Sequence, residues 1–394
     1  MHKPLEGIRI LEWGIFYAGP GASAILSDMG AEVIKLEQRG EGDPFRQADL
    51  TGLEVSGDSE ILFQGANRGK KSITLDLAQA EGRQVAYDLV NKSDIFFTNV
   101  RSETIQKLQM DYPTLSRINP RIIYARITAY GTRGPDADRG GFDPHGQARS
   151  GMMYALGEDE PVFARFGIID HSTAIMASYQ MVIALLMRER FGVSQEVEVS
   201  LLGTAAYLMY IGNLPALLGK RDYVEYKNMG PLRNKYRCLD GKWLMIRMRD
   251  KDWLTLCRFL GCGELEHDSR FDTPEKRMIN SEHLVSIFEK AFATRERDQW
   301  LRIFSDKSLM ICAVNTQLES FSDPQMIENG YIINTQHPDL GPVRVPGFPI
   351  HFSQAEVNSS IAAPRLGEHT SEILHDLLGY SEERIATLRA RGVV

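Results

Sequence analysis

The first part of the chain alternates short apolar runs with amphipathic runs of helical period. Helices are predicted over Ala22 to Met29, after the turn Gly19-Pro20-Gly21, and over Ala80 to Val90. Buried strands are predicted over the apolar runs Ile8 to Trp13, Ala31 to Glu37, Lys71 to Leu75, Asp94 to Asn99 and Ile122 to Thr128. This alternation is typical of a parallel sheet covered by helices, so we expect a large Rossmann-like α/β domain.

The pattern changes between Leu214 and Asn234, where Pro, Gly, Lys and Tyr replace the periodic positions, as in a linker. Beyond it, Asp240-Gly241 separates two strand-like runs, Tyr236 to Leu239 and Lys242 to Met248, and predicts a hairpin. Helical patterns follow over Trp253 to Leu260, His283 to Ala291, Arg297 to Phe304, Ser371 to Leu378 and Ser381 to Arg391. We expect a large domain over 1–215, a linker over 216–235, a smaller α+β domain over 236–330, and a C-terminal segment over 331–394 that returns to the large domain.

One carboxylate stands at a junction of two patterns. Phe166 to Asp170 reads as an apolar, strand-like run that stops at Asp170, and the helical pattern Thr173 to Met187 follows. A carboxylate at such a junction is accessible and lies near a helix dipole that favours its ionised form, which suits a nucleophile. Capping the helix is the commoner use of aspartate at this position. The pattern alone leaves both roles open.

Composition narrows the classes of partner. The chain has 394 residues, 43% of them hydrophobic, and a net charge of -7, which argues against nucleic acid as the main partner. The four cysteines have no paired spacing, so we expect no structural zinc, no disulfides and a reducing compartment. Met1 to Glu6 lacks the apolar core of a signal peptide, and Ala174 to Met187 is shorter than the ~20 residues of a membrane span. We expect a cytoplasmic protein without a membrane partner.

The turn Gly14 to Gly21 follows the first predicted strand, where open α/β sheets bind ligands. Its small residues permit close approach of a phosphate or a pantetheine arm. Although Glu37 ends the second strand as a ribose-binding acid does, the turn lacks the GxGxxG pattern. A nicotinamide dehydrogenase is therefore disfavoured.

Several motifs, taken in their order and spacing, are similar to one family nearly end to end. The motifs are Pro4 to Leu11, Ala18-Gly19-Pro20, Gly30 to Glu37, Gly42 to Arg46, Asn67 to Asp76, Gly131 to Pro135, Phe142-Asp143 with Gln147 to Met152, and Leu366 to Thr370. Together they resemble the class III coenzyme A transferases, also called the CaiB/BaiF family.

The resemblance implies that Asp170 is the catalytic nucleophile. Its carboxylate would attack an acyl-CoA thioester to give a mixed anhydride, and the CoA thiolate would then form an aspartyl-CoA thioester. Such covalent catalysis conserves the thioester's free energy and divides one difficult exchange into easier steps. The resemblance also implies acyl-CoA and small carboxylic acids as substrates, no tightly bound cofactor, no metal, and an interlocked homodimer.

Other positions are carried over where the motifs match. CoA contacts are expected at Ala18, Leu75, Asn99, Arg101 and Lys107, and at Arg39, which stands one position after the family's basic residue because Gln38 occupies that place. Substrate contacts are expected at Tyr17, Phe142, Asp143 and Gln147. For both Asp143 and Gln147, a structural role in a turn or a helix cap is the alternative. His171 and His145 are expected to be structural.

Two features bear on the acceptor acid. Tyr17 stands where the members specific for formyl-CoA and oxalate carry a glutamine, so oxalate is doubtful. The segment Gly134 to Asp143, with Thr98 to Arg101, looks most like the branch that acts on 2-hydroxy acids, including aryl-substituted ones.

Two other functions remain as alternatives. An α-methylacyl-CoA racemase needs two proton-transfer groups, and related racemases are similar to a Gly-His-Asp sequence where this chain has Gly141-Phe142-Asp143. Phe142 cannot transfer a proton, which favours CoA transfer. A non-catalytic acyl-CoA binding protein is the other alternative, and Asp170 in its full motif argues against it.

Overall fold

The computed structural model describes residues 2–47, 61–157, 160–219, 230–305, 309–338, 340–357 and 362–394. The chain divides into two compact units. The large unit comprises Met1–Arg221 and Asn329–Val394, and the small unit comprises Asp222–Glu328. Of the expected linker 216–235, residues 216–219 lie in a helix, residues 233–235 lie in a strand, and residues 220–229 fall outside the described part.

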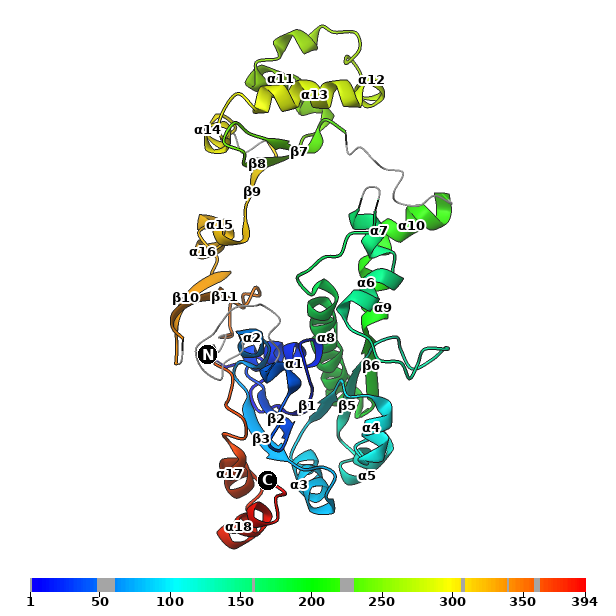
Figure 1. Cartoon of the computed structure of the whole chain (residues 1–394), viewed down its shortest axis with the longest axis vertical. Helices are drawn as coiled ribbons and strands as arrows, with labels where there is room; N and C mark the ends of the chain where they lie inside the picture. Colours follow the sequence, from blue (N-terminus) through cyan, green and yellow to red (C-terminus); the bar gives the residue numbers. More distant parts are fainter. Residues whose placement is uncertain are drawn as a thin grey trace. The chain divides into compact units, whose positions relative to one another are not determined.

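A parallel sheet of six strands forms the centre of the large unit (Figure 1). The strand order is β3-β2-β1-β4-β5-β6, and Leu11 of β1 pairs with Ile34 of β2 and Phe96 of β4. The bounds are β1 (Arg9–Trp13), β2 (Glu32–Gln38), β3 (Lys71–Leu75), β4 (Ile95–Thr98), β5 (Ile123–Thr128) and β6 (Glu196–Ser200). The order reverses between β1 and β4, which is the point where such sheets bind ligands.

The first five strands confirm the expected ones to within one or two residues, whereas β6 was not expected. Its alternation of Glu and Val is the pattern of an edge strand with one partly solvated face.

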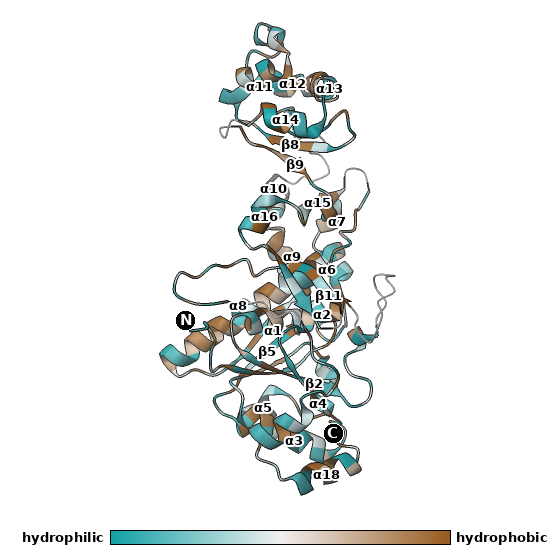
Figure 2. Ribbon diagram, turned by 90° about the vertical axis from the view of Figure 1, so that its left-hand side faces the viewer, coloured by the Kyte–Doolittle hydropathy of each residue, from teal (hydrophilic) through white to brown (hydrophobic). Residues whose placement is uncertain are grey.

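Three helices cover one face of the sheet. They are α1 (Ala18–Asp28), α8 (Ile168–Phe191) and α9 (Leu201–Leu208), and their apolar residues share a core with Ile10, Val33 and Phe97. Figure 2 shows hydrophobic residues along most of α8. The expectation that α1 starts after Gly19-Pro20-Gly21 is wrong, because these residues form its first turn. Pro20 fits there because N–H groups of a first turn have no intrahelical partner.

The opposite face carries α3 (Ala80–Asn91), α5 (Tyr112–Ile118) and the C-terminal helices. The latter are α17 (Thr370–Glu372), a π-helical turn η5 (Ile373–Leu377) and α18 (Glu382–Ala390). Ile373, Leu374 and Leu388 pack in one core with Leu36 of β2 and Ile73 of β3. The end of the chain therefore belongs to the large unit.

The remaining elements of the large unit lie around this three-layer centre. They are η1 (Pro44–Arg46), α2 (Ile61–Asn67), α4 (Ser102–Lys107), α6 (Asp143–Arg149), α7 (Met152–Leu156), α10 (Tyr210–Gly219) and an antiparallel hairpin of β10 (Ile332–His337) and β11 (Gly341–Pro346).

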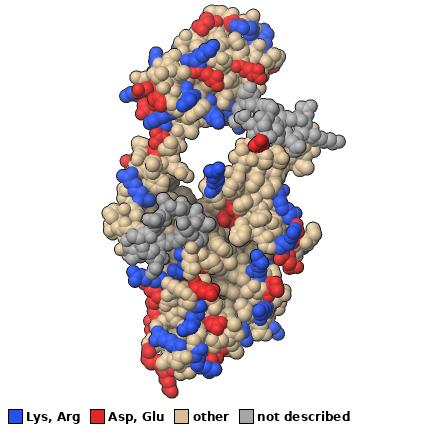
Figure 3. Space-filling view, viewed as in Figure 1, with Lys and Arg blue, Asp and Glu red and all other residues tan. Residues whose placement is uncertain are grey.

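The small unit has its own sheet and its own core. β7 (Arg233–Arg237), β8 (Trp243–Arg247) and β9 (Ile311–Val314) form an antiparallel sheet whose first two strands confirm the expected hairpin. Its helices are η3 (Asp250–Asp252), α11 (Trp253–Leu260), η4 (Gly263–Glu266), α12 (Pro274–Ile279), α13 (Ser281–Phe292), α14 (Arg297–Ile303), α15 (Gln317–Ser320) and α16 (Pro324–Glu328). Aromatic residues Tyr236, Phe288, Phe292 and Trp300 dominate the core. Figure 3 shows both signs of charge interspersed over the visible face of this unit.

The expected α/β class, with a large parallel-sheet unit and a smaller α+β unit, is confirmed. Within the described ranges, no single helix has the length and hydropathy of a membrane span. In the part of the chain that the structure describes, α9 and α10 meet the criteria of length and hydropathy only as a pair, and they are bent by 70° relative to each other.

Candidate active site

Asp170 lies in the first turn of α8, not at the end of a strand. The helix begins at Ile168, and its N-cap is Gly167, whose backbone is left-handed with φ of 64°. The strand-like run expected before Asp170 is therefore wrong. Gly167 permits the sharp entry into the helix, and Ile169 buries its side chain in the core from the first turn.

Asp143 does the capping that Asp170 could have done. The buried Asp143 carboxylate accepts the backbone N–H groups of Ile169 at 2.6 Å and of Asp170 at 3.0 Å. Gln147 donates to the other oxygen of Asp143 and exchanges two hydrogen bonds with the backbone of Ala164, both at 3.0 Å. The alternative that Asp170 is the N-cap is therefore wrong, and its carboxylate is left for other contacts.

The surroundings of Asp170 disfavour its charged form. Burial raises the pKa of Asp170 to about 7, and the neighbouring Asp143 charge adds to this effect. The first turn of a long helix favours an anion, which opposes this effect. A desolvated carboxylate whose pKa is near neutral is more basic than one in water, and this favours a nucleophilic role.

A cavity of about 190 Å³ opens beside Asp170, at the carboxyl ends of β1, β4 and β5. It lies at the point where the strand order reverses. The structure brings six of the expected site residues to its lining: Tyr17, Ala18, Asn99, Arg101, Phe142 and Asp170.

The other expected site residues do not belong to that lining. Arg39 donates to the Val394 backbone oxygen at 3.0 Å, and Leu75 is fully buried in the core. Lys107 is exposed in the last turn of α4. Asp143 and Gln147 lie behind Asp170, where they bond to backbone groups of the fold.

The loop between β1 and α1 is held from two sides. The side-chain amide of Asn99 accepts from the Ile15 N–H at 2.9 Å and donates to its carbonyl at 2.8 Å. A Cβ atom at Gly19 would lie 2.7 Å from the Asn99 side chain, so glycine is required for this close approach. Phe16 has a left-handed backbone with φ of 58°, and its N–H donates to Asp43 at 3.0 Å.

A buried charge cluster, defined here as Glu12, Lys35, Asp43 and Lys70, supports this loop. Lys35 donates to Glu12 at 3.0 Å and to Asp43 at 2.9 Å, and Lys70 donates to Glu12 at 2.6 Å. Although burial opposes ionisation, the two lysines lower the pKa of Glu12 to about 2. Lys35 also donates to the Gly14 carbonyl at 2.9 Å, which links the cluster to the start of the loop.

Aromatic rings surround the mouth of the cavity near Asp170. Phe142 is 54% exposed and packs edge-on against Phe16 with centroids 5.6 Å apart. Tyr17 packs edge-on against Phe45 at 6.4 Å. The Tyr17 hydroxyl is hydrogen-bonded to Nδ1 of His171 at 2.9 Å. His145 accepts the Phe142 N–H at 3.1 Å, a contact within the first turn of α6.

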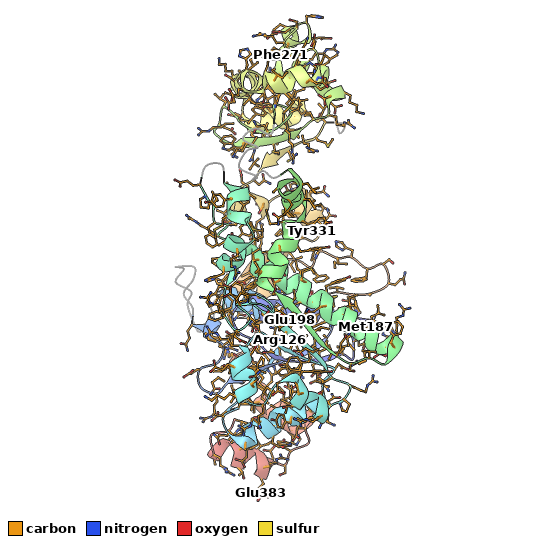
Figure 4. The ribbon with its side chains drawn as sticks, turned by 90° about the vertical axis from the view of Figure 1, so that its right-hand side faces the viewer. Arg126, Met187, Glu198, Phe271, Tyr331 and Glu383 are labelled. Atoms are coloured by element: carbon orange, nitrogen blue, oxygen red, sulfur yellow. The ribbon has the colours of Figure 1, made fainter. Side chains whose placement is uncertain are left out.

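Sequence reasoning missed Arg126, Arg139 and Phe16, all of which line the cavity. Arg126 donates to Ser102 at 2.8 Å and lies 3.5 Å from Glu196, but its buried Nε atom has no partner among the described residues. It extends from β5 next to its register partner Glu198 of β6 (Figure 4). The available signal was a single cation within the otherwise apolar run Ile122 to Thr128.

The described residues contain no group of three or more His, Cys, Asp or Glu side chains that could hold a metal ion. The arrangement presents one partly desolvated carboxylate, three arginines (Arg101, Arg126 and Arg139) and an aromatic rim in one cavity. Such a site suits a ligand that combines anionic groups with a reactive carbonyl.

The pattern of CoA-transferase family III matches residues 5–370. The chain therefore belongs to CoA-transferase family III, and the enzyme class expected from the sequence is confirmed. It is similar to the succinyl-CoA:glutarate CoA-transferase of Mus musculus (30% identical, covering 100% of this chain and 90% of the relative) and to the succinyl-CoA–D-citramalate CoA-transferase of Chloroflexus aurantiacus (31%, 100% and 98%). It is also similar to the (R)-2-hydroxy-4-methylpentanoate CoA-transferase of Clostridioides difficile (28%, 99% and 99%).

Among solved structures, a CaiB/BaiF family protein from Brucella suis is similar over 96% of this chain and 100% of its own, with a TM-score of 0.86 and 31% identity. The fold and the family assignment therefore agree.

Proposed function

We propose that the protein moves CoA from an acyl-CoA donor to a carboxylic acid acceptor through covalent intermediates on Asp170. The observation that carries this proposal is the Asp170 carboxylate itself. It lines the cavity at the point where the strand order of the sheet reverses. Asp143 accepts hydrogen bonds from N–H groups at the start of α8, so the Asp170 carboxylate is not needed as a helix cap. Burial makes the ionised carboxylate more basic than an exposed one.

The reaction runs through two kinds of intermediate. An Asp170 oxygen bonds to the thioester carbonyl carbon, the C–S bond breaks, and CoA leaves as a thiolate, which gives a mixed anhydride of Asp170 and the donor acid. The thiolate then attacks the aspartyl carbonyl, which releases the donor acid as a carboxylate and leaves aspartyl-CoA. The acceptor carboxylate attacks this thioester, and the same steps in reverse deliver the acceptor's CoA thioester and regenerate Asp170.

Coenzyme A is bound as a substrate, with no tightly held cofactor. Arg101 and Asn99 in the cavity support binding of CoA at the ends of β1 and β4, and Ala18 leaves room for it. Arg39 and Lys107 are also proposed to contact CoA, whereas Leu75 is fully buried in the core and is not. A guanidinium group binds phosphate through paired hydrogen bonds, which is the role proposed for Arg101.

The acceptor is proposed to be a 2-hydroxy or aryl-substituted acid. The aromatic rim of Phe16, Tyr17 and Phe142 favours an acceptor with an apolar substituent. The relative from Clostridioides difficile is named for a branched 2-hydroxy acid, and the Chloroflexus relative for citramalate. Asp143 and Gln147 are proposed to support this end of the site by holding the first turn of α8.

The protein is proposed to act as an interlocked homodimer in the cytoplasm. Four apolar side chains at helical spacing on α8 are exposed by 37% to 60%: Ile175, Tyr179, Ile183 and Leu186. An apolar stripe of this kind is typical of a surface that a partner covers. All four cysteines are free, which supports a reducing compartment.

The test is to incubate the protein with succinyl-CoA and a panel of acids, and to follow new thioesters by mass spectrometry. The panel contains glutarate, citramalate, 2-hydroxy-4-methylpentanoate and phenyllactate. Transfer by the wild type and its loss in Asp170→Asn are expected, while Glu189→Gln, an exposed carboxylate change in the same helix, keeps the wild-type rate. Transfer by Asp170→Asn at the wild-type rate would refute the mechanism. Exchange of an α-proton without acyl exchange would instead support a racemase. Binding of acyl-CoA without either reaction would support a non-catalytic binding protein.

A further inference from the structure

His171 follows the proposed nucleophile in the chain, and among the described residues its side chain makes one hydrogen bond, which runs across to another element. Its Nδ1 atom lies 2.9 Å from the hydroxyl of Tyr17, the residue that precedes α1. The first turn of α8 thus carries Asp170 and also holds a side chain of the β1–α1 loop. Contact between these two elements is close, since a Cβ atom at Gly21 would lie 3.4 Å from Ala174 and 3.5 Å from the Tyr17 ring.

The Tyr17 ring is fixed on several sides. Phe45 packs edge-on against it, Gly21 lies beneath it, and the ring of His171 stands 5.8 Å away. A ring held in this way has little freedom to move, so the hydroxyl oxygen has one position in the site.

Tyr17 and Asp170 line the same cavity, and the Tyr17 hydroxyl keeps its proton at neutral pH. Burial raises the pKa of Tyr17, with Arg68 opposing and the Asp170 charge adding to the rise, so Tyr17 is protonated at neutral pH. Burial and the charge of Arg68 lower the pKa of His171, so its ring is neutral there. A neutral imidazole with its proton on Nδ1 donates to the phenol oxygen and leaves the phenol proton for another acceptor.

We infer that Tyr17 donates this proton in a hydrogen bond to the carbonyl oxygen of the acyl-CoA under attack by Asp170, and that His171 is the positioning residue that holds Tyr17 for this role. The inference rests on the proposed function. As the Asp170 oxygen bonds to the carbonyl carbon, negative charge develops on the carbonyl oxygen, and a preorganised donor stabilises that charge most in the transition state. A donation from His171 to the phenol oxygen strengthens the donation from the phenol to the substrate.

The same chemistry explains why a tyrosine and a histidine occur together here. Alone, a tyrosine hydroxyl beside a carboxylate would donate to that carboxylate and weaken it as a nucleophile. By occupying one lone pair of the phenol oxygen, the His171 proton limits the directions in which the phenol proton can point. Tyr17 and His171 therefore act as one unit, and the removal of either member removes the same interaction.

The test uses succinyl-CoA with whichever acid of the panel the wild type accepts, and single-turnover kinetics of CoA release. Tyr17→Phe keeps the ring and removes the hydroxyl, and we expect kcat to fall about 100-fold with the KM for succinyl-CoA changed by less than about threefold. An asparagine amide nitrogen occupies the place of histidine Nδ1, whereas a glutamine amide nitrogen occupies that of Nε2. His171→Asn should therefore keep kcat within about threefold of the wild type, and His171→Gln should lose as much as Tyr17→Phe.

The double variant separates positioning from a purely structural role. In the Tyr17→Phe background, His171→Gln should cause no further loss, because the interaction is already gone. Equal rates for His171→Asn and His171→Gln, additive losses, or a Tyr17→Phe variant at the wild-type rate would each overturn the inference. Thermal melts of each variant identify any loss of kcat that comes from unfolding. For folded variants, the difference in kcat between His171→Asn and His171→Gln then tests whether His171 positions Tyr17. Failure of the proposed function looks different, since the wild type would then show no transfer or Asp170→Asn would retain it.

Discussion

At the scale of single residues, the ionisation of the proposed nucleophile Asp170 should set the pH range of the enzyme. Only the carboxylate form can attack a thioester, and its pKa is raised to about 7 by burial and by Asp143. The rate should therefore rise with pH through about 7 and then level off. A pH profile of kcat/KM for succinyl-CoA between pH 5 and 9 measures this acid limb.

The Asp143 charge contributes to that pKa, so a neutral residue of the same shape should shift the profile. Asp143→Asn can still accept the N–H groups of Ile169 and Asp170 through its amide oxygen. We expect the acid limb to move to lower pH because one of the two influences that raise the pKa of Asp170 is gone. An acid limb that stays in place or moves to higher pH would contradict the assignment of the limb to Asp170.

Asp170 should also lower the stability of the folded protein at neutral pH. Its folded-state pKa of about 7 exceeds the usual 3.8, so the folded state binds more protons than the unfolded state between these values. Stability from this group is therefore present at low pH and is lost as pH rises through about 7. Asp170→Asn should raise Tm relative to the wild type at pH 8, by more than at pH 5, as measured by calorimetry. A larger gain at pH 5 than at pH 8 would reverse the sign and refute the shift.

The residue-level chemistry was only partly readable from the sequence. Asp170 was identified by its motif, but capping and nucleophilic roles could not be separated without Asp143, which is 27 residues away in the chain. The bond from Tyr17 to His171 spans 154 residues. Contacts of such separation depend on how α1 and α8 pack, and local patterns do not encode that packing.

At the scale of elements, the β1–α1 loop depends on the buried charge cluster. Lys35→Met would leave Asp43 without its paired cation in a dry environment, would leave Glu12 paired with Lys70 alone, and would free the Gly14 carbonyl. We expect a loss of about 3–5 kcal/mol of unfolding free energy. Urea titration measures it as a lower midpoint.

Lys71→Met is the matched control, because Lys71 is the next residue after Lys70 but is half-exposed, with pairs to Glu32 and Glu372. It should change stability by less than about 1 kcal/mol. Equal losses of unfolding free energy from Lys35→Met and Lys71→Met would mean that burial does not determine how much the cluster contributes to stability.

The close approach of α1 to Asn99 makes a second prediction for this loop. Gly19→Ala would place a Cβ atom 2.7 Å from the Asn99 side chain and should cost about 1–3 kcal/mol, with a fall in transfer rate because Asn99 holds Ile15. Gly65→Ala, in α2 with open space around the new Cβ, should be neutral or stabilising by up to about 1 kcal/mol. If Gly65→Ala destabilised as much as Gly19→Ala, steric conflict would not be the cause.

Elements of regular pattern were predictable, and irregular ones were not. β3 and α11 occupy the expected residues, since their apolar content and flanking turns mark both ends. β6 was not predicted because its glutamates make the segment resemble a polar loop, although it forms an edge strand. The starts of α1 and α8 were misplaced because proline and glycine, usual signs of a turn, lie inside or directly before a first helical turn here.

At the scale of the whole molecule, two separate cores imply two structural transitions. Of the four tryptophans, Trp243, Trp253 and Trp300 lie in the small unit and Trp13 in the large one. Leu256→Ala, a change in the core of the small unit, should lower the denaturation midpoint seen by tryptophan fluorescence, with a loss of about 2–5 kcal/mol. The midpoint seen by far-UV circular dichroism should shift less. Coincident shifts of both signals would show that the units unfold as one.

The proposed homodimer makes a prediction for the mass in solution. Light scattering after gel filtration should give twice the mass of the 44.4 kDa chain. Tyr179→Glu, in the centre of the stripe, should weaken the dimer, while Glu189→Gln on the same helix should not. A monomeric wild type at micromolar concentration would contradict the proposal.

The buried charge cluster also limits how this protein can diverge. Each of Glu12, Lys35, Asp43 and Lys70 balances another, so a mutation at any one of them leaves an unmatched charge where water cannot reach. Descendants could leave this arrangement only through several coordinated substitutions, whereas the exposed rim at Phe142 can change one residue at a time. A change of acceptor acid is therefore expected to arise through substitutions at the rim and not in the buried charge cluster. Directed evolution libraries should vary the rim residues and keep the cluster unchanged.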